Sequence, residues 1–252
     1  MRKWLAALFV FAATGCTTSL ASAVDMAPMY ARPSVSPLAA GLYCSVAVSW
    51  RPDNEVVSVA AGGRESCRNY SWDLSRRLVI AQALEGQDGK PPESLEIALA
   101  SLGDGLFLAQ TANTDSEGET NEAAPYILFP VLITGAIFSY TSPLEGSELA
   151  QLASRFPQVS FATFGETDDR RYIKSGARED ILAFVRDVSL LGLSRPDENG
   201  GMTLSLFTRM SSPDPEPVLS VLRRPDVAAA GEAASRLAKL APAGIELQKP
   251  AY

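Results

Sequence analysis

Hydrophobic and polar residues alternate over short segments in the first half of the chain. Every second position from Leu42 to Trp50 is apolar, and three of the four positions between them are Ser or Ala. Period-two alternation is typical of a strand with one buried face. Similar runs lie at 55–60, 66–73, 76–84 and 95–112, the last interrupted by Asp104-Gly105. Because Asp-Gly between two apolar runs favours a tight turn, the pattern predicts an antiparallel β meander.

The segment 123–140, AAPYILFPVLITGAIFSY, contains no charged residue. Its length is marginal for a membrane span, and Pro125, Pro130 and Gly135 interrupt it. β-branched and aromatic residues dominate it, which favours strands over a helix. We expect one bent strand or two short ones, buried on both faces.

Helical patterns appear only after this segment. Ser142 and Pro143 suit the first positions of a helix, residues 177–191 carry an apolar stripe that ends at Gly192, and a further helix is expected from Pro225 to Leu240. The predicted fold class is therefore α+β: an antiparallel meander or partly closed barrel, followed by a smaller α/β part with two to three helices. The expected divisions are a β-rich domain at 41–140, a helix–strand–helix–strand part packed on it at 141–210, and a linker with a C-terminal helix at 211–252.

The N-terminus has the form of a bacterial-type signal sequence. Arg2 and Lys3 precede an uncharged apolar run over 4–13, which is too short to span a bilayer. Ala21-Ser22-Ala23 offers a general cleavage site, which gives a signal sequence over 1–23 and leaves a flexible tether over 24–40. An earlier site competes with it at the end of the apolar run.

That earlier site, Ala13-Thr14-Gly15-Cys16, resembles the lipobox of bacterial lipoproteins. The resemblance covers only the signal region and departs from the family at Ala13, where leucine is usual. It implies that Cys16 is acylated and becomes the mature N-terminus, attached to the membrane through its lipid. Because Thr17 is not the aspartate that retains many enteric lipoproteins, the resemblance implies an outer-membrane anchor on the periplasmic side. The alternative cleavage after Ala23 would leave a soluble periplasmic protein.

Two cysteines, Cys44 and Cys67, remain in either case. An exported chain with an even pair of thiols most often joins them, since the periplasm is oxidising. Both lie on segments with strand patterns, so a cross-strand disulfide is the preferred prediction. A buried, unpaired pair is the alternative.

Charge and composition exclude several classes of function. The formal net charge is −7, which argues against nucleic-acid binding and against adhesion to anionic lipid through the protein surface. The chain has no histidine. Ser-His-Asp and Cys-His catalysis and the usual zinc sites are therefore absent, and we expect no cofactor.

Two acidic clusters and one aromatic group remain as candidates. Closely spaced carboxylates in 113–122 could hold Ca²⁺, although a solvated acidic loop explains them more simply: Asp115, Glu117, Glu119 and Glu122. Glu166, Asp168 and Asp169 could serve as acid and base in a hydrolase, or form local ion pairs with Arg170 and Arg171. Four aromatics of the meander could line a ligand cavity or simply fill a core: Trp50, Tyr70, Trp72 and Phe107.

These features favour an exported, lipid-anchored cell-envelope protein with a non-enzymatic binding or structural role. Its partner would be another envelope protein or a small apolar ligand. One alternative is a lipocalin-like carrier of a small apolar ligand, and another is an exported hydrolase that uses carboxylates.

Overall fold

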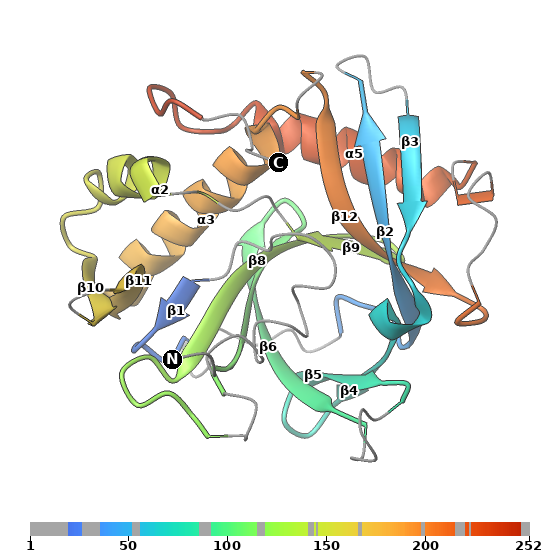
Figure 1. Ribbon diagram of the computed structural model, residues 1–252, viewed down its shortest axis with the longest axis horizontal. Helices are drawn as coiled ribbons and strands as arrows, with labels where there is room; N and C mark the ends of the chain where they lie inside the picture. The colour runs from blue at the N-terminus through green and yellow to red at the C-terminus, as the bar shows by residue number, and fades with distance from the viewer. Residues whose placement is uncertain are drawn as a thin grey trace.

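A closed β-barrel dominates the structure, a computed structural model (Figure 1). It describes residues 20–26, 36–51, 56–85, 92–114, 119–140, 144, 146–165, 168–197, 200–214, 220–221 and 223–247. The strands are β1 (Leu20–Ser22), β2 (Gly41–Trp50), β3 (Val56–Ala61), β4 (Arg68–Asp73), β5 (Leu78–Ala83), β6 (Ser94–Gly103), β7 (Leu106–Ala112), β8 (Tyr126–Thr134), β9 (Ile137–Tyr140), β10 (Ser160–Gly165), β11 (Asp168–Ser175) and β12 (Met202–Met210). The helices are the short 3₁₀ turn η1 (Arg64–Ser66), α2 (Gly146–Ala153), α3 (Arg178–Ser194) and α5 (Pro225–Ala238).

Eight strands form the barrel in the order in which they occur along the chain. β2, β4, β5, β6, β7, β8, β9 and β12 each pair antiparallel with the next, and β12 pairs with β2 to close the ring. Figure 1 shows these strands arranged in a ring, with α3 and α5 outside it. This is the up-and-down arrangement, which removes the exposed edges of an open meander. The predicted meander is confirmed, and the barrel is closed rather than partly open.

The turns of the meander follow the local sequence. Asp104 and Gly105 connect β6 to β7 with φ of 55° and 82°, as the predicted tight turn requires. The uncharged segment forms two strands, β8 and β9, joined at Gly135 with φ of 60°. On one side β8 pairs with β1 over 126–128 and with β9 over 131–134, so Pro130 falls between its two partners there. Among the described residues, no helix is long and apolar enough to cross a membrane.

The predicted helices form, with shifted ends. α5 begins at Pro225, which occupies an early helical position where its missing N–H costs nothing. α3 continues through Gly192 to Ser194, so the predicted stop at Gly192 is wrong. Gly192 is buried within the helix instead of ending it. Ser142 and Pro143, the predicted start of the first helix, lie outside the described residues.

Both faces of the barrel wall are buried over much of its surface. One cluster fills the interior and includes Tyr43, Tyr70, Phe138 and Phe207. Two further clusters lie between the outer face and the helices, one under α5 and one under α3. Within the range 141–210, which was expected to pack on the β-rich domain, β12 completes the barrel and the helices lie against its outer face.

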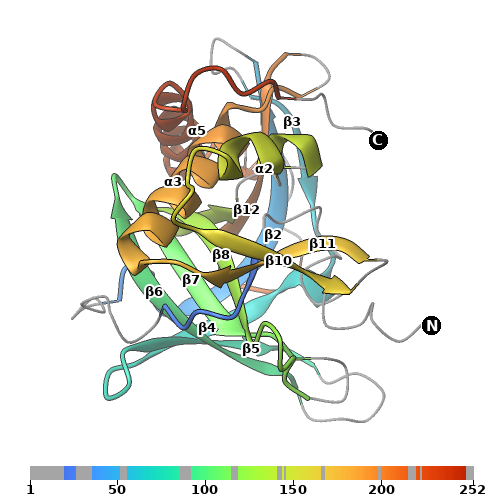
Figure 2. The same cartoon turned by 90° about the vertical axis from the view of Figure 1, so that its left-hand side faces the viewer.

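The N-terminal strand β1 belongs to the same sheet. β1 pairs antiparallel with β8 and parallel with β11, and β11 continues to β10, so β1 connects the β10–β11 hairpin to the barrel (Figure 2). Leu20 is 6% exposed, Ser22 is fully buried, and the Ala23 amide donates to the Ile173 carbonyl at 2.8 Å. Strand structure thus falls within the range expected to be signal sequence.

Parts of the expected tether also pack against the barrel. Met26 is 1% exposed, and its amide donates to Gln110 Oε1 at 2.6 Å. Leu38 is 6% exposed and belongs to the interior cluster. Met26 and Leu38 therefore pack on the barrel although they lie in the range expected to be a flexible tether.

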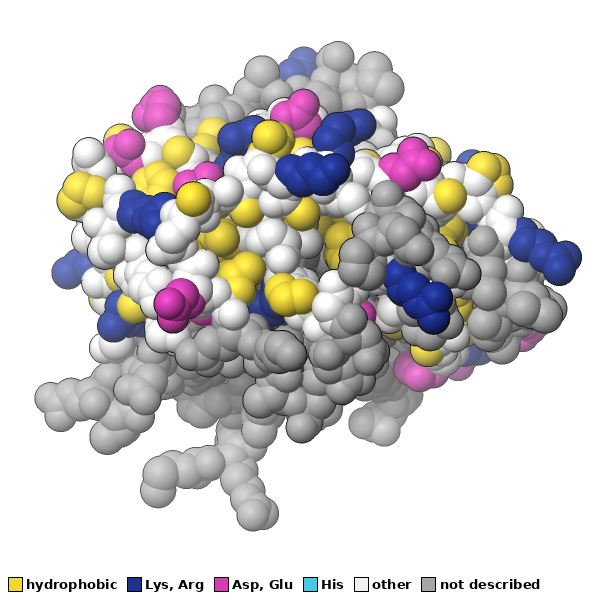
Figure 3. All heavy atoms as spheres, turned by 90° about the horizontal axis from the view of Figure 1, so that it is seen from above, with side chains coloured by type: hydrophobic (Ala, Val, Ile, Leu, Met, Phe, Trp, Pro, Cys, Tyr) yellow, Lys and Arg dark blue, Asp and Glu magenta, His cyan; other side chains and the backbone are white. Residues whose placement is uncertain are grey.

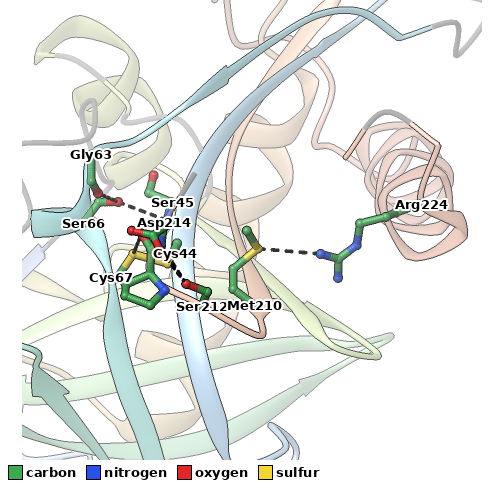
Figure 4. Close-up of a disulfide and its surroundings, with 10 residues drawn as sticks. Cys44, Ser45, Gly63, Ser66, Cys67, Met210, Ser212, Asp214 and Arg224 are labelled. Atoms are coloured by element: carbon green, nitrogen blue, oxygen red, sulfur yellow. Dashed lines mark hydrogen bonds between the residues drawn. A yellow bond between two sulfur atoms is a disulfide. The ribbon is translucent and has the colours of Figure 1, made fainter. Parts of the chain in front are cut away.

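The predicted disulfide is present. Cys44 on β2 is bonded to Cys67, immediately before β4, and the bond closes a loop that contains β3 and η1 (Figure 4). For a sequence separation of 23 residues, restriction of the unfolded chain corresponds to about 3 kcal/mol of stabilisation. The bond also holds Tyr43, which precedes Cys44, close to Arg68, which follows Cys67, and these two residues are opposite one another in the β2–β4 pairing.

Candidate ligand site inside the barrel

Aromatic rings fill the centre of the barrel. They come from β2, β4, β8, β9 and β12, and contact one another as edge-to-face, tilted or stacked pairs: Tyr43, Tyr70, Phe129, Phe138, Tyr140 and Phe207. The centroids of the stacked pair Phe138 and Phe207 are 4.7 Å apart. Strand residues two apart share a face, so each strand contributes its inward set. The rings form a stiff inner wall.

A small cavity remains beside these rings. It measures about 20 Å³, room for roughly one water molecule. Its lining is apolar except for two phenol hydroxyls: Leu38, Tyr70, Val79, Ile97, Leu99, Ala109, Phe129, Val131, Ile133, Phe138 and Tyr140. A water there would find few partners, whereas an apolar group would lose nothing by entering.

Leu38 is the lining residue that no barrel strand supplies. It lies in the segment 36–40, just before β2, and its side chain is buried against the interior cluster. Tyr43 Oη donates to the Ala39 carbonyl at 2.9 Å, which fastens this segment to the barrel interior. Withdrawal of one leucine side chain would enlarge the cavity without changing any strand pairing.

Three of the four predicted cavity aromatics face the interior. Tyr70 lines the cavity, and Trp72 and Phe107 pack on the same cluster. Trp50 does not join them. It shares the outward face of β2 with Val46 and Val48 and lies under α5, where a Cβ built on Gly231 would be 2.6 Å from Trp50 Nε1.

Burial controls the titration of the interior phenols. It raises the pKa of Tyr70 and Tyr140 well above the ordinary value of a tyrosine, and the Arg68 guanidinium lowers both by a smaller amount. Burial likewise raises the pKa of Tyr43, and Arg209 lowers it in part. The phenols stay neutral at physiological pH, when their hydroxyls can both donate and accept hydrogen bonds.

The sequence patterns missed several interior residues. Phe129, Phe138, Tyr140 and Phe207 were not candidates, although they lie in the strand segments 126–134, 137–140 and 202–210. Leu38 has no such pattern, because it precedes the first barrel strand. Arg68 was missed because an isolated arginine in a strand looks like a solvent-facing residue.

The acidic candidates form no site within the described part of the chain. Asp115, Glu117 and Glu166 lie outside the described residues, as do the side chains of Asp168 and Asp169, whose backbone begins β11. Glu119 and Glu122 are exposed. Among the residues described, no three of the types His, Cys, Asp and Glu gather closely enough to hold a metal ion.

Charges of both signs are scattered over the face seen in Figure 3. Basic and acidic side chains lie there among hydrophobic ones rather than in one region. This mixture and the net charge of −7 give a nucleic acid no extended basic surface on that face.

Comparisons with known proteins suggest no function for the chain, so the interior of the barrel is the main guide to it. No protein-family model matches the chain, and neither a curated protein nor a solved structure matches it. The site must therefore be interpreted from its own chemistry.

Proposed function

We propose that this protein is a lipid-anchored binding protein of the cell envelope that holds a small apolar molecule inside its barrel. The observation that carries the proposal is the apolar cavity, lined by strands β4 to β9 and by Leu38. Eight-stranded up-and-down barrels have interiors of a size that can hold one small ligand, as lipocalins do. The likeness to lipocalins is one of architecture alone.

The size of the cavity limits how a ligand is held. At about 20 Å³ the cavity accepts no ligand larger than a water or methyl group while Leu38 is in place. The ligand therefore takes the space of the Leu38 side chain, and its apolar surface replaces that of the leucine among the other apolar residues that line the cavity. The strands β4 to β9 stay paired throughout.

The position of β1 supports processing at Cys16. Cleavage after Ala23 would remove a strand from between β8 and β11 and leave the β10–β11 hairpin without its connection to the barrel. Processing at Cys16 keeps β1. Only residues 17–19 then separate the acylated cysteine from Leu20, so at most about 14 Å of chain connects the lipid to the sheet. The barrel would lie close to the membrane, with the β1 side nearest to it.

Mass spectrometry of the protein purified from its own envelope tests both parts of this proposal. Under native conditions we expect a mass above that of the chain, which falls on denaturation as the apolar molecule is released. The denatured mass should correspond to a chain that starts at an acylated Cys16, and Cys16→Ser should abolish the acyl mass. A soluble protein that starts at Val24 would contradict the anchor, and a native mass equal to the denatured one would count against the ligand.

A further inference from the structure

The first residue of β4, Arg68, lies on the inner face of the barrel. In the strand register it stands opposite Tyr43 of β2 and Ala83 of β5. It shares the face of Tyr70, two residues along β4, because alternate strand residues point to the same side. The disulfide of Cys67, the preceding residue, to Cys44, the neighbour of Tyr43, fixes this position. The side chain is only partly exposed.

The guanidinium of Arg68 lies near the two phenols that line the cavity. It lowers the pKa of Tyr70 and of Tyr140, which come from separate strands, against the larger effect of burial. The register and this electrostatic effect agree: Arg68 lies on the inward face of β4, which it shares with the cavity residue Tyr70.

Arg68 has no acidic partner among the described residues. No ion pair and no side-chain hydrogen bond joins it to any of them, whereas the fully buried arginine of the described residues, Arg195, is paired with Glu148. A cation removed from water without an anion is unfavourable. A second donor on the same face of β4, Trp72 Nε1, is buried without an acceptor within the described structure. The partly buried guanidinium of Arg68 and the indole N–H of Trp72 are both donors, so the complementary ligand supplies acceptors.

We infer that the barrel's ligand is a single-chain amphipathic carboxylate whose apolar part enters the cavity and whose carboxylate accepts hydrogen bonds from Arg68. The planar guanidinium can bind both carboxylate oxygens. Val79, Leu99 and Val131 would contact the apolar chain. This inference rests on the proposed function and specifies the class of ligand.

Displacement of the neutral fluorescent probe N-phenyl-1-naphthylamine by decanoate and by methyl decanoate tests the inference. The two competitors share one chain and differ in charge. We expect the wild-type protein to bind decanoate at least tenfold more tightly than the ester. Arg68→Gln should weaken decanoate binding by about 10- to 100-fold, the range for a hydrogen bond to a charged group, and leave ester binding unchanged.

Two further variants complete the test. Arg64→Gln removes the same charge from an exposed arginine outside the barrel and should leave the affinity for both competitors unchanged. Arg68→Lys, which keeps the charge, should lose less decanoate affinity than Arg68→Gln. Equal binding of acid and ester by the wild-type protein, or an unchanged acid affinity in Arg68→Gln, would overturn the carboxylate assignment while the barrel still bound apolar molecules. If the wild-type protein binds neither the probe nor the competitors, the proposed function itself fails.

Discussion

Replacing Arg195 by methionine is expected to lower the free energy of unfolding by about 3–5 kcal/mol. The side chains of Arg195 and Glu148 are 4% and 0% exposed and form an ion pair that connects the end of α3 to the first turn of α2. Removing the arginine leaves the Glu148 carboxylate in a buried site without its countercharge. Equilibrium denaturation in urea, followed by circular dichroism, measures the loss.

A double variant distinguishes the cost of burying the Glu148 carboxylate without Arg195 from the cost of losing the arginine side chain itself. Glu148→Leu with Arg195→Met should recover most of the stability, because two apolar residues need no countercharge. Arg64→Met, which breaks the exposed pair with Glu85, should change the stability by less than about 1 kcal/mol. If Arg195→Met were as harmless as Arg64→Met, the ion pair would not hold α2 to α3.

Replacing Trp50 by alanine is expected to cost about 3–5 kcal/mol, the usual range for removing a fully buried aromatic side chain. Trp50 is 1% exposed and lies in the cluster between β2, β12 and α5. Without the indole, α5 faces a cavity at its contact with the barrel wall. The same urea denaturation measures the effect.

Enlarging the α5 residue that faces Trp50 tests the same contact from the helix side. Gly231→Ala should also destabilise the protein, because the new Cβ would lie 2.6 Å from Trp50 Nε1 and force α5 away from the wall. Alanine normally stabilises a helix interior by about 1 kcal/mol relative to glycine. Gly146→Ala in α2, where no heavy atom lies within 4 Å of the added Cβ, should show no such loss. A stabilising Gly231→Ala would contradict the close packing of α5 on Trp50.

Local patterns predicted which residues share a face, but not which face became the interior. Alternation correctly grouped Trp50 with Val48, and the Asp104-Gly105 turn followed from its own residues. Both faces of β2 are buried, however, one by the barrel and one by α5. Nothing within residues 41–50 distinguishes the two environments, because the distinction comes from α5, nearly two hundred residues later.

Barrel closure and the role of the N-terminal residues also depend on distant contacts. β12 looked like a strand from its sequence, but its pairing with β2 joins segments about 160 residues apart, which no local signal reports. Leu20 and Leu38 stand in segments whose composition is typical of processing sites and tethers. Their burial depends on the strands that later residues provide.

The residues of the candidate site were likewise only partly predictable from the sequence. Tyr70, Trp72 and Phe107 could be predicted as inward aromatics, since each lies on a strand with clear alternation. Arg68 and Leu38 could not, because one is a charged residue at a strand end and the other precedes the barrel. Their importance follows from what surrounds them: phenols beside a cation that has no acidic partner among the described residues in one case, and a cavity in the other.

Binding of N-phenyl-1-naphthylamine to three variants tests most directly whether the barrel interior is a ligand site. Leu38→Ala should bind the probe roughly tenfold more tightly than the wild type, because no leucine has to be displaced. Ala109→Leu, which fills the cavity from β7, should weaken binding at least tenfold, whereas Ala112→Leu, at an exposed position of the same strand, should leave it unchanged. Equal probe affinity in the wild type and all three variants would show that the probe binds elsewhere, and would contradict a ligand site inside the barrel.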